Sequence, residues 1–316
     1  MKLAVLFPGQ GSQYIGMGSE FIASSADCAA IMEMAGAVCD FPLAKIIAEG
    51  PMEDLTRAAV LQPAITVTNL ICLKALQGAL PESVEVSCYA GHSLGEFSAL
   101  CGAGVLSVAD TIKLVERRGY LMGREGDIKP GGMRAILGLG IEDIEQTVSS
   151  YRGIGDVTVA NYNTPQQIVI SGSVEGLDWV SAAAEKQGAK VIALNVSIAN
   201  HSPLVEGAVE DFATVIDSVH FSTPRSTVYF NLTAEPEDDP SRIRQMMARQ
   251  IVSRVRWYEI ISAMLAHGVD TFVEVGPKTV LKGMMRKIVP KGVKVTTLQF
   301  DTPESLQGCI EKLNLG

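Results

Sequence analysis

The sequence is poor in the residues that build disulfide frameworks and metal centres. It has six cysteines and four histidines in 316 residues, with no C-x-x-C pair and no cysteine–histidine set at zinc spacing. The pattern argues against a disulfide-stabilised fold and against a zinc site. We expect most of the cysteines to be buried as small apolar side chains.

The sequence also lacks a surplus of positive charge and a long apolar run. Its formal net charge is −9, whereas nucleic-acid binding needs clustered Lys and Arg. At the start, MKLAVLFPGQGSQ has one lysine and a five-residue apolar run that ends at Pro8, which is too short for a signal peptide. No later run approaches membrane length. We therefore expect a cytoplasmic protein that binds neither nucleic acid nor membrane.

Nucleotide-binding motifs are missing as well. The loop FPGQGSQ has glycines at 9 and 11, but the next glycine is Gly16, not residue 14, so the dinucleotide fingerprint fails. There is no Walker A lysine.

One segment reverses the overall charge. Between Arg242 and Lys291 there are ten Lys and Arg residues against three acidic residues, Glu259, Asp270 and Glu274. Solvated helix faces explain most such runs. The other interpretation is a docking surface for an acidic partner.

Alternating strand and helix patterns predict an α/β fold. Continuous apolar strands that alternate with helices are typical of a parallel sheet covered by helices. The strand TFVEV at 271–275 and a final helix from Thr279 are expected to end this body. We expect an α/β-hydrolase-like body with a mostly parallel sheet, formed by residues 1–129 and 197–316.

Residues 130–196 have a different pattern. Strand, helix, strand, strand, helix and strand follow one another in the stretches MRAILGL, the helix from Ile141, VTVANYN, QIVISGS, the helix from Val174, and KVIALNV. The order β-α-β-β-α-β is the signature of a ferredoxin-like unit. We expect a small subdomain that is inserted into the larger body.

Ser93 lies in YAGHSLGEFSAL, at the predicted junction of a strand with a helix. G-x-S-x-G alone is a weak signal, but the strand that leads in and the helix that leads out are typical of a nucleophile elbow. Gly91 and Gly95 allow the close backbone approach that this turn needs. We interpret Ser93 as a nucleophile; the alternative is an ordinary turn serine.

A serine nucleophile needs a base, and histidine is the usual one. The chain has four candidates: His92, His201, His220 and His267. His92 adjoins Ser93, so the two side chains should diverge. His267 is predicted at a helix C-terminus, where we expect the imidazole to contact the last carbonyls. His201 lies in a loop before a predicted helix, where functional groups are common, although a lone loop histidine can be incidental.

Arg118 is predicted to face inward from a helix. Its neighbours at i−4, i−3, i+3 and i+4 are apolar: Leu114, Val115, Leu121 and Met122. A buried arginine keeps its proton and so needs an anionic partner or several acceptors. One interpretation is an internal ion pair with an Asp or Glu, and the other is a fork that binds a substrate carboxylate.

Several motifs occur together in one order along almost the whole chain. They are FPGQGSQ at 7–13, GHSLGE at 91–96, ERRG at 116–119, ANYNTPQQIVISG at 160–172, His201, RQIVSRVRW at 249–257 and VEVGP at 273–277. In this combination the sequence resembles the malonyl-CoA:acyl carrier protein transacylases and the related acyltransferase domains of fatty acid and polyketide synthases. The resemblance implies that a malonyl group moves from malonyl-CoA to the pantetheine thiol of an acyl carrier protein in a ping-pong reaction. It implies no cofactor, since malonyl-CoA is a substrate.

The resemblance also assigns site residues. It implies that Ser93 forms the acyl-enzyme and that His201 is its base, oriented by a backbone carbonyl rather than by a carboxylate. The other implied groups are the backbone N–H groups of Gln10 and Leu94 as the oxyanion hole, Arg118 as the holder of the malonyl carboxylate, and Gln250 and Asn161 near the substrate. The basic segment becomes the candidate carrier surface, near Arg286 and Lys287.

Two positions depart from the family pattern. Asn200 stands where relatives commonly have Phe or Ser and can alter the pocket wall, and Arg254 stands where many have proline.

Three rival functions stay open. A serine esterase or thioesterase would need an acid between Ser93 and His201 and a histidine near the C-terminus, and neither is clear. A trans-acting polyketide acyltransferase or acyl hydrolase shares the whole pattern. A non-enzymatic carrier-binding scaffold would not need Ser93, His201 and Arg118.

Overall fold

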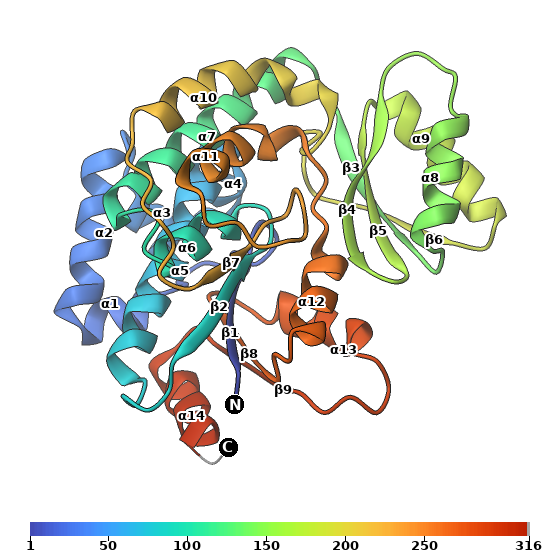
Figure 1. Cartoon of the computed structure of the whole chain (residues 1–316). Coiled ribbons are helices and arrows are strands. Elements are labelled where there is room, and N and C mark those ends of the chain that lie inside the picture. Colours follow the sequence, from blue (N-terminus) through green and yellow to red (C-terminus); the bar gives the residue numbers. More distant parts are fainter. Residues whose placement is uncertain (315–316) are drawn as a thin grey trace.

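The computed structural model describes residues 1–314, which form two separate sheets with helices packed around them (Figure 1). The first sheet has five strands in the order β7-β2-β1-β8-β9, and every neighbouring pair is parallel. Its strands are β1 (Leu3–Phe7), β2 (Val86–Gly91), β7 (Thr227–Tyr229), β8 (Thr271–Val275) and β9 (Thr296–Phe300). All residues of β1 and β8 are buried, as expected for apolar strands covered on both faces.

Helices enclose this parallel sheet and complete the main apolar core. Those that precede the second sheet are α1 (Ser19–Ser24), α2 (Ala26–Val38), α3 (Leu43–Glu49), α4 (Met52–Thr56), α5 (Ala58–Ala79), α6 (Gly95–Gly102) and α7 (Val108–Ile128). Those that follow it are η1 (Pro203–Ala208), α10 (Val209–Asp217), α11 (Pro240–Arg249), η2 (Gln250–Val252), α12 (Trp257–Ala266), α13 (Val280–Ile288) and α14 (Pro303–Asn314), where η denotes a 3-10 helix.

The helix α5 is long and apolar enough to cross a membrane, by length and composition only. It has 22 residues, the mean hydropathy of its most apolar window is 1.5, and 83% of that window is buried inside the protein. The expectation that no run approaches membrane length therefore does not hold for α5. Because α2, α6 and α7 pack against it, its apolar surface is already covered by the protein.

The second sheet has four strands in the order β4-β5-β3-β6, and all neighbours are antiparallel. Its elements are β3 (Gly132–Leu137), α8 (Ile141–Ser150), β4 (Val157–Thr164), β5 (Gln167–Gly172), α9 (Val174–Lys186) and β6 (Lys190–Ala193). This is the predicted ferredoxin-like unit beside a parallel α/β body, so the predicted fold class is confirmed. The exact division of the chain at residues 130 and 196 stays a prediction.

A short backbone pairing connects the two bodies. The N–H of Val255 donates to the carbonyl of Ala160 at 2.8 Å, and the N–H of Tyr162 donates to the carbonyl of Val255 at 2.9 Å. Arg254, one of the two departures from the family pattern, forms an ion pair with Glu145 at 2.7 Å. The segment that leads into α12 therefore pairs with β4 through its backbone, and the second sheet lies beside the parallel α/β body (Figure 1).

One local prediction differs from the structure. The helix predicted from Thr279 is α13, but it is not the last element, because β9 and α14 follow it. Between α1 and α2 lies Ser25, whose side chain accepts from the N–H of Cys28 and so starts α2. Ser107 caps α7, since its Oγ accepts from the N–H of Asp110 at 3.0 Å.

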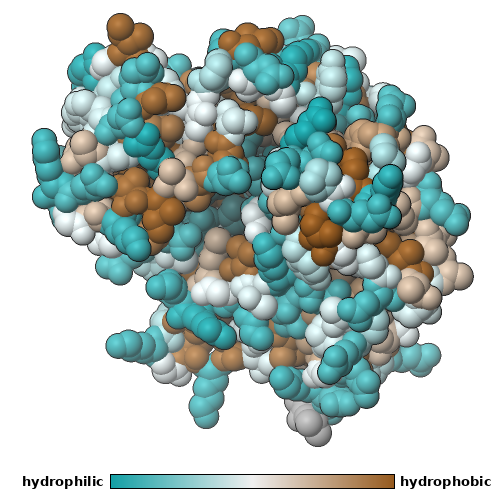
Figure 2. Space-filling view, turned by 180° about the vertical axis from the view of Figure 1, so that it is seen from behind, coloured by the Kyte–Doolittle hydropathy of each residue, from teal (hydrophilic) through white to brown (hydrophobic). Residues whose placement is uncertain are grey.

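The surface seen from behind is mainly hydrophilic. Figure 2 shows apolar side chains scattered in small groups among polar ones on this face. Most of the large apolar side chains are buried in the core. Ser93 lies where β2 ends and α6 begins.

Candidate active site

Ser93 lies on a sharp turn between β2 and α6. Its φ is 48°, a left-handed value that a serine seldom adopts. A Cβ on Gly91 would lie 1.9 Å from the carbonyl carbon of Gly95, and a Cβ on Gly95 would lie 2.2 Å from the carbonyl oxygen of Phe7. Only glycine fits at these two positions, so the turn has the strained geometry of a nucleophile elbow.

Asn231 holds this turn from the loop after β7. Its Oδ1 accepts from the N–H of Ser93 at 2.7 Å, and its Nδ2 donates to the carbonyl of Gly91 at 2.7 Å. The two bonds span both sides of the turn, so they fix the backbone that carries the serine hydroxyl.

His201 is buried and meets Ser93 across the elbow. Its φ is 59°, and its Nε2 lies 2.7 Å from Ser93 Oγ. Its Nδ1 lies 2.8 Å from the carbonyl oxygen of Ser253 and 3.1 Å from that of Gln250, both of which can only accept. The proton must therefore be on Nδ1, which leaves Nε2 free to accept the Ser93 proton.

Burial is the main cause that lowers the pKa of His201 to about 3, and the charge of Arg118 acts in the same direction. The imidazole is therefore neutral near pH 7. A neutral imidazole that accepts from a serine hydroxyl is the arrangement of an activated nucleophile.

Arg118 is buried in the middle of α7 and points toward Ser93. Its Nη1 donates to Gln62 Oε1 at 2.7 Å, and its Nη2 donates to Gln250 Oε1 at 2.9 Å and to Ser93 Oγ at 3.4 Å. Its Nε has no acceptor among residues 1–314. Burial lowers the pKa of Arg118 to about 10, with the nearby charge of Glu96 acting against the shift.

The internal ion pair considered for Arg118 does not occur within residues 1–314. None of the salt bridges in this part of the chain includes the Arg118 guanidinium, and its direct partners are neutral oxygens. A charged donor with an unused N–H beside a serine hydroxyl can bind a carboxylate.

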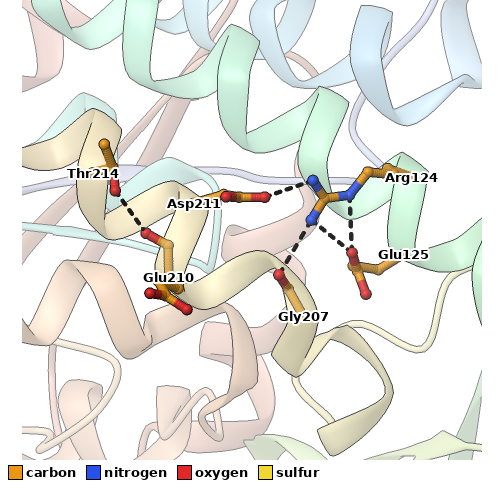
Figure 3. A network of polar contacts seen from close by, with 6 residues as sticks. All are labelled: Arg124, Glu125, Gly207, Glu210, Asp211 and Thr214. Carbon is orange, nitrogen blue, oxygen red and sulfur yellow. Dashed lines mark hydrogen bonds and ion pairs between the residues drawn. The ribbon is translucent and has the colours of Figure 1, made fainter.

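A network at the end of α7 fixes the segment that follows His201. Figure 3 shows Arg124 between Glu125 and Asp211, and its Nη1 donates to Asp211 of α10 at 2.6 Å. Its Nη2 donates to the carbonyl of Gly207 in η1 at 3.2 Å. These bonds hold η1 and α10 against the helix that carries Arg118, which supports the position of His201 just before η1.

A cavity of about 340 Å³ lies between the two sheets and contains the serine hydroxyl. It is lined by Gly9, Gln10, Gly11, Gln13, Thr56, Leu61, His92, Ser93, Met133, Ala135, Asn161, Asn163, Gln167, Val169, Leu194, Asn195, Val196, Asn200, His201, Val280, Leu281 and Met284. Asn200, the other departure from the family pattern, is one of the residues that line this cavity. A larger hollow of about 670 Å³, around Glu85 and Asp238, contains none of the predicted site residues.

The two predicted oxyanion residues lie at the wall of this cavity or beside it. Gln10 is in the loop after β1, and Leu94 follows Ser93 directly, at the N-terminus of α6. Within residues 1–314 neither backbone N–H donates a hydrogen bond. Both groups are therefore available to an oxygen that develops charge near Ser93.

Thus Ser93, His201, Arg118 and Gln250 converge, while Gln10, Leu94 and Asn161 lie around them. The roles of five residues were not predicted: Gln62, His92, Glu96, Asn163 and Asn231. His92 and Glu96 lie in the motif GHSLGE and Asn163 in ANYNTPQQIVISG, whereas Gln62 and Asn231 lie in none of the motifs. His267 lies at the C-terminus of α12 as predicted, but the expected contact of its imidazole was wrong, because Nδ1 lies 2.6 Å from the hydroxyl of Tyr229 and not against helix carbonyls. No group of three or more His, Cys, Asp or Glu side chains that could hold a metal occurs in the described part of the chain.

Comparison with known proteins gives one consistent family. The acyl transferase domain model matches residues 5–299. A malonyl CoA-acyl carrier protein transacylase of Bacillus subtilis (strain 168) is 36% identical over 316 residues, which cover 99% of this chain and 97% of that protein. The solved transacylase of the same name from Coxiella burnetii has a TM-score of 0.93 at 30% identity and covers 99% of this chain and 98% of that one. A malonyl-transacylase solved in complex with a type II polyketide acyl-carrier protein has a TM-score of 0.92 at 31% identity, covering 99% and 100%.

The parallel α/β body, the serine elbow and the matched domain together define an enzyme of the acyltransferase class. More particularly, the chain belongs to the malonyl-CoA:acyl carrier protein transacylase family.

Proposed function

We propose that this enzyme transfers the malonyl group of malonyl-CoA to the pantetheine thiol of an acyl carrier protein through malonyl-Ser93. In the first half-reaction the Ser93 oxygen attacks the thioester carbonyl while His201 Nε2 takes the hydroxyl proton. The C–S bond then breaks, and His201 returns the proton to the sulfur as CoA leaves. The second half-reaction runs the same steps from the carrier thiol, which makes the mechanism ping-pong.

The N–H groups of Gln10 and Leu94 stabilise the tetrahedral oxygen in both half-reactions. A donor of this kind contributes roughly 3 to 4 kcal/mol to the transition state. Their lack of other acceptors in the described chain supports this role, because a donor already paired would not be free for the oxygen.

Arg118 holds the free carboxylate of the malonyl group, and Gln250 and Asn161 lie around the bound acyl group. A neutral acyl chain would leave the N–H groups of the buried guanidinium without a carboxylate acceptor, so malonyl is favoured over acetyl. The distance of 3.4 Å from Arg118 Nη2 to Ser93 Oγ supports this, since one guanidinium can reach both the acyl carboxylate and the reacting oxygen.

The carrier protein docks beside α13. Val280 and Met284 of this helix line the cavity, and Lys287 continues the same helical face three residues further on. Arg286 and Lys287 are both exposed, so they can meet the acidic surface of a carrier. We expect the reaction to take place in the cytoplasm and to need no cofactor.

A single observation carries the proposal: Ser93 Oγ lies 2.7 Å from His201 Nε2 and within reach of a buried guanidinium without a carboxylate partner. The test is intact-mass measurement after incubation with malonyl-CoA, then with the phosphopantetheinylated carrier. The wild type should gain one malonyl group and pass it to the carrier, and Ser93→Ala should gain none. Malonylation that persists in Ser93→Ala contradicts the nucleophile, and loss of the malonyl group to water instead of the carrier indicates an acyl hydrolase.

A further inference from the structure

Glu96 is a buried acid directly beneath the Ser93 turn. It lies in the first turn of α6 and is 1% exposed. Its Oε1 accepts from the N–H of Asn231 at 2.6 Å, and its Oε2 accepts from Gln250 Nε2 at 2.7 Å. The proposed transfer reaction assigns this carboxylate no task, although it lies one side chain away from Arg118.

The carboxamide of Gln250 connects Glu96 to Arg118. Its Nε2 donates to Glu96 Oε2 and to the carbonyl of Ser93, while its Oε1 accepts from Arg118 Nη2. A guanidinium can only donate and an ionised carboxylate can only accept. Gln250 can satisfy both only in this orientation, so the chain of bonds has a fixed direction from Arg118 to Glu96.

Glu96 and Arg118 are also each other's counter-charge. The guanidinium is charged at every physiological pH, and a buried cation without an anion is costly. Burial raises the pKa of Glu96 to about 7, while its hydrogen bonds and the charge of Arg118 act in the opposite direction. Two donors reach its two oxygens, which fits the ionised form when the site is empty.

Within the described residues, Arg118 is the charged group that acts on the pKa of Glu96. The helix α7 packs against α6, and its other buried charged residue, Glu125, pairs with Arg124. The strand β1 is apolar, and burial raises the pKa of both Cys88 and Tyr89 in β2 to about 12, which keeps them neutral. The one lysine of α5, Lys74, pairs with Asp27 near the surface. From α10, Phe212 packs on Phe97 of α6. Arg118 is thus the charged neighbour of Glu96.

We propose that Glu96 is a proton-linked positioning residue: it is ionised while Arg118 has no acyl carboxylate, and it takes up a proton when the malonyl carboxylate binds the guanidinium. This inference rests on the proposed function, because it needs the malonyl group at Arg118. In the empty site the charges of Arg118 and Glu96 cancel. A malonyl carboxylate adds a second negative charge beside one cation, so a proton on Glu96 restores neutrality.

The proton balance of acylation allows this step to be measured. The bond between Ser93 Oγ and the acyl carbon forms, the thioester C–S bond breaks, and the hydroxyl proton ends on the CoA sulfur. The exchange itself is therefore proton-neutral. Any proton taken up by Glu96 comes from the solvent, whereas acylation by a neutral acetyl group should cause no uptake.

The experiment mixes the enzyme with malonyl-CoA, without carrier, in weakly buffered solution that contains a pH indicator dye. Intact mass counts the malonyl groups in the same sample, and the titration of free CoA corrects for its released thiol. Near pH 8 the wild type should take up more than about half a proton per malonyl group, because Glu96 is then mostly ionised in the empty enzyme. Toward about pH 6 the uptake should vanish, since Glu96 is already protonated.

Two variants identify the group that takes up the proton. Glu96→Gln should become malonylated with an uptake below about one tenth of a proton. Glu274→Gln is the matched control, because Glu274 is also 1% exposed and burial raises its pKa to about 7, but it binds the N–H groups of Leu281 and Lys282. This control should keep the wild-type uptake.

The outcomes separate this inference from the proposed function. If no malonyl group appears on the wild type, the proposed function fails. If malonylation occurs without proton uptake near pH 8, or if the uptake persists at about pH 6, the role of Glu96 is wrong while the transfer reaction stands. An uptake that persists in Glu96→Gln also overturns it, and the wild-type pH profile decides the matter even if that variant is unstable.

Discussion

Nε2 of His92 lies 2.8 Å from Oδ1 of Asn163, so one hydrogen bond joins the turn before Ser93 to strand β4 of the second sheet. The His92 ring also packs edge-on against Trp257, with 5.5 Å between the ring centres. Both His92 and Asn163 line the cavity. This bond therefore connects the two walls between which the acyl group has to lie.

Replacing Asn163 with Ala should loosen this connection. The partly buried imidazole of His92 loses its acceptor, which should lower the free energy of unfolding by about 1 to 3 kcal/mol and raise the KM for malonyl-CoA. Chemical denaturation and initial rates measure the two effects. Asn161→Ala is the matched control, since Asn161 lines the same cavity and its side chain forms no hydrogen bond within the described chain. We expect Asn161→Ala to raise KM with a stability loss below about 1 kcal/mol; equal losses in both variants would contradict the bridging role.

Arg118→Ala should remove the preference for malonyl over acetyl. Loss of a charge-assisted, buried pairing with the acyl carboxylate should lower kcat/KM for malonyl-CoA by about 100- to 1,000-fold, with a much smaller change for acetyl-CoA. The control is Arg117→Ala, because Arg117 is the exposed neighbour on the same helix and lies over the ring of Tyr120. That variant should stay within about twofold of the wild type. An unchanged malonyl-to-acetyl ratio in Arg118→Ala would refute the clamp.

The elbow and the inward arginine could be predicted because their signals are local. The strand, the glycines around Ser93 and the helix are adjacent in sequence, and the apolar neighbours of Arg118 repeat at helical spacing. His201 could be assigned as the base only because the other histidines were less suitable and because the family resemblance implies it. The bonds of Asn163, Asn231 and Gln62 could not be predicted, since they span 71, 138 and 56 residues. Asn163 lies in the motif ANYNTPQQIVISG, but the motif does not show which residue it contacts.

The fold was predictable to a similar extent. The β-α-β-β-α-β order and the parallel body follow from periodicity, but the sequence pattern missed β9 and α14. Those two elements pack at the edge of the first sheet, where β9 alternates between buried and partly exposed residues and so lacks the continuous apolar run of β1.

The buried His201 should make stability depend on pH. Its pKa in the folded protein is about 3, below the value of about 6.5 in the unfolded chain, so the unfolded state binds more protons between these values. This group therefore costs stability as pH falls below about 6.5. His201→Ala removes this cost. As pH falls from about 6.5 to 5.5, the free energy of unfolding of this variant should rise by about 1 kcal/mol relative to that of the wild type.

Urea titrations at several pH values measure this difference. Ser93→Ala keeps the buried imidazole, so its stability should follow the pH dependence of the wild type. If the difference between His201→Ala and the wild type does not change with pH, the imidazole is not held neutral by burial.

Charge reversal on α13 should separate the two half-reactions. If Arg286 and Lys287 meet the carrier, Arg286→Glu with Lys287→Glu should lower the rate of transfer to the carrier by about tenfold at low salt. The rate of malonylation by malonyl-CoA should stay within about twofold, because neither side chain lines the cavity. Single-turnover mass measurements follow each step.

A matched double reversal tests whether the effect is specific to α13. Lys186 and Lys190 are exposed at the end of α9 and the start of β6, and neither lines the cavity. Lys186→Glu with Lys190→Glu changes the net charge by the same amount, so it should leave transfer to the carrier unchanged if docking is local. The defect on α13 should also shrink as salt is raised, since screening weakens exposed charge pairs. Equal defects in the two doubly substituted enzymes would show that net charge, and not the α13 surface, governs the encounter with the carrier.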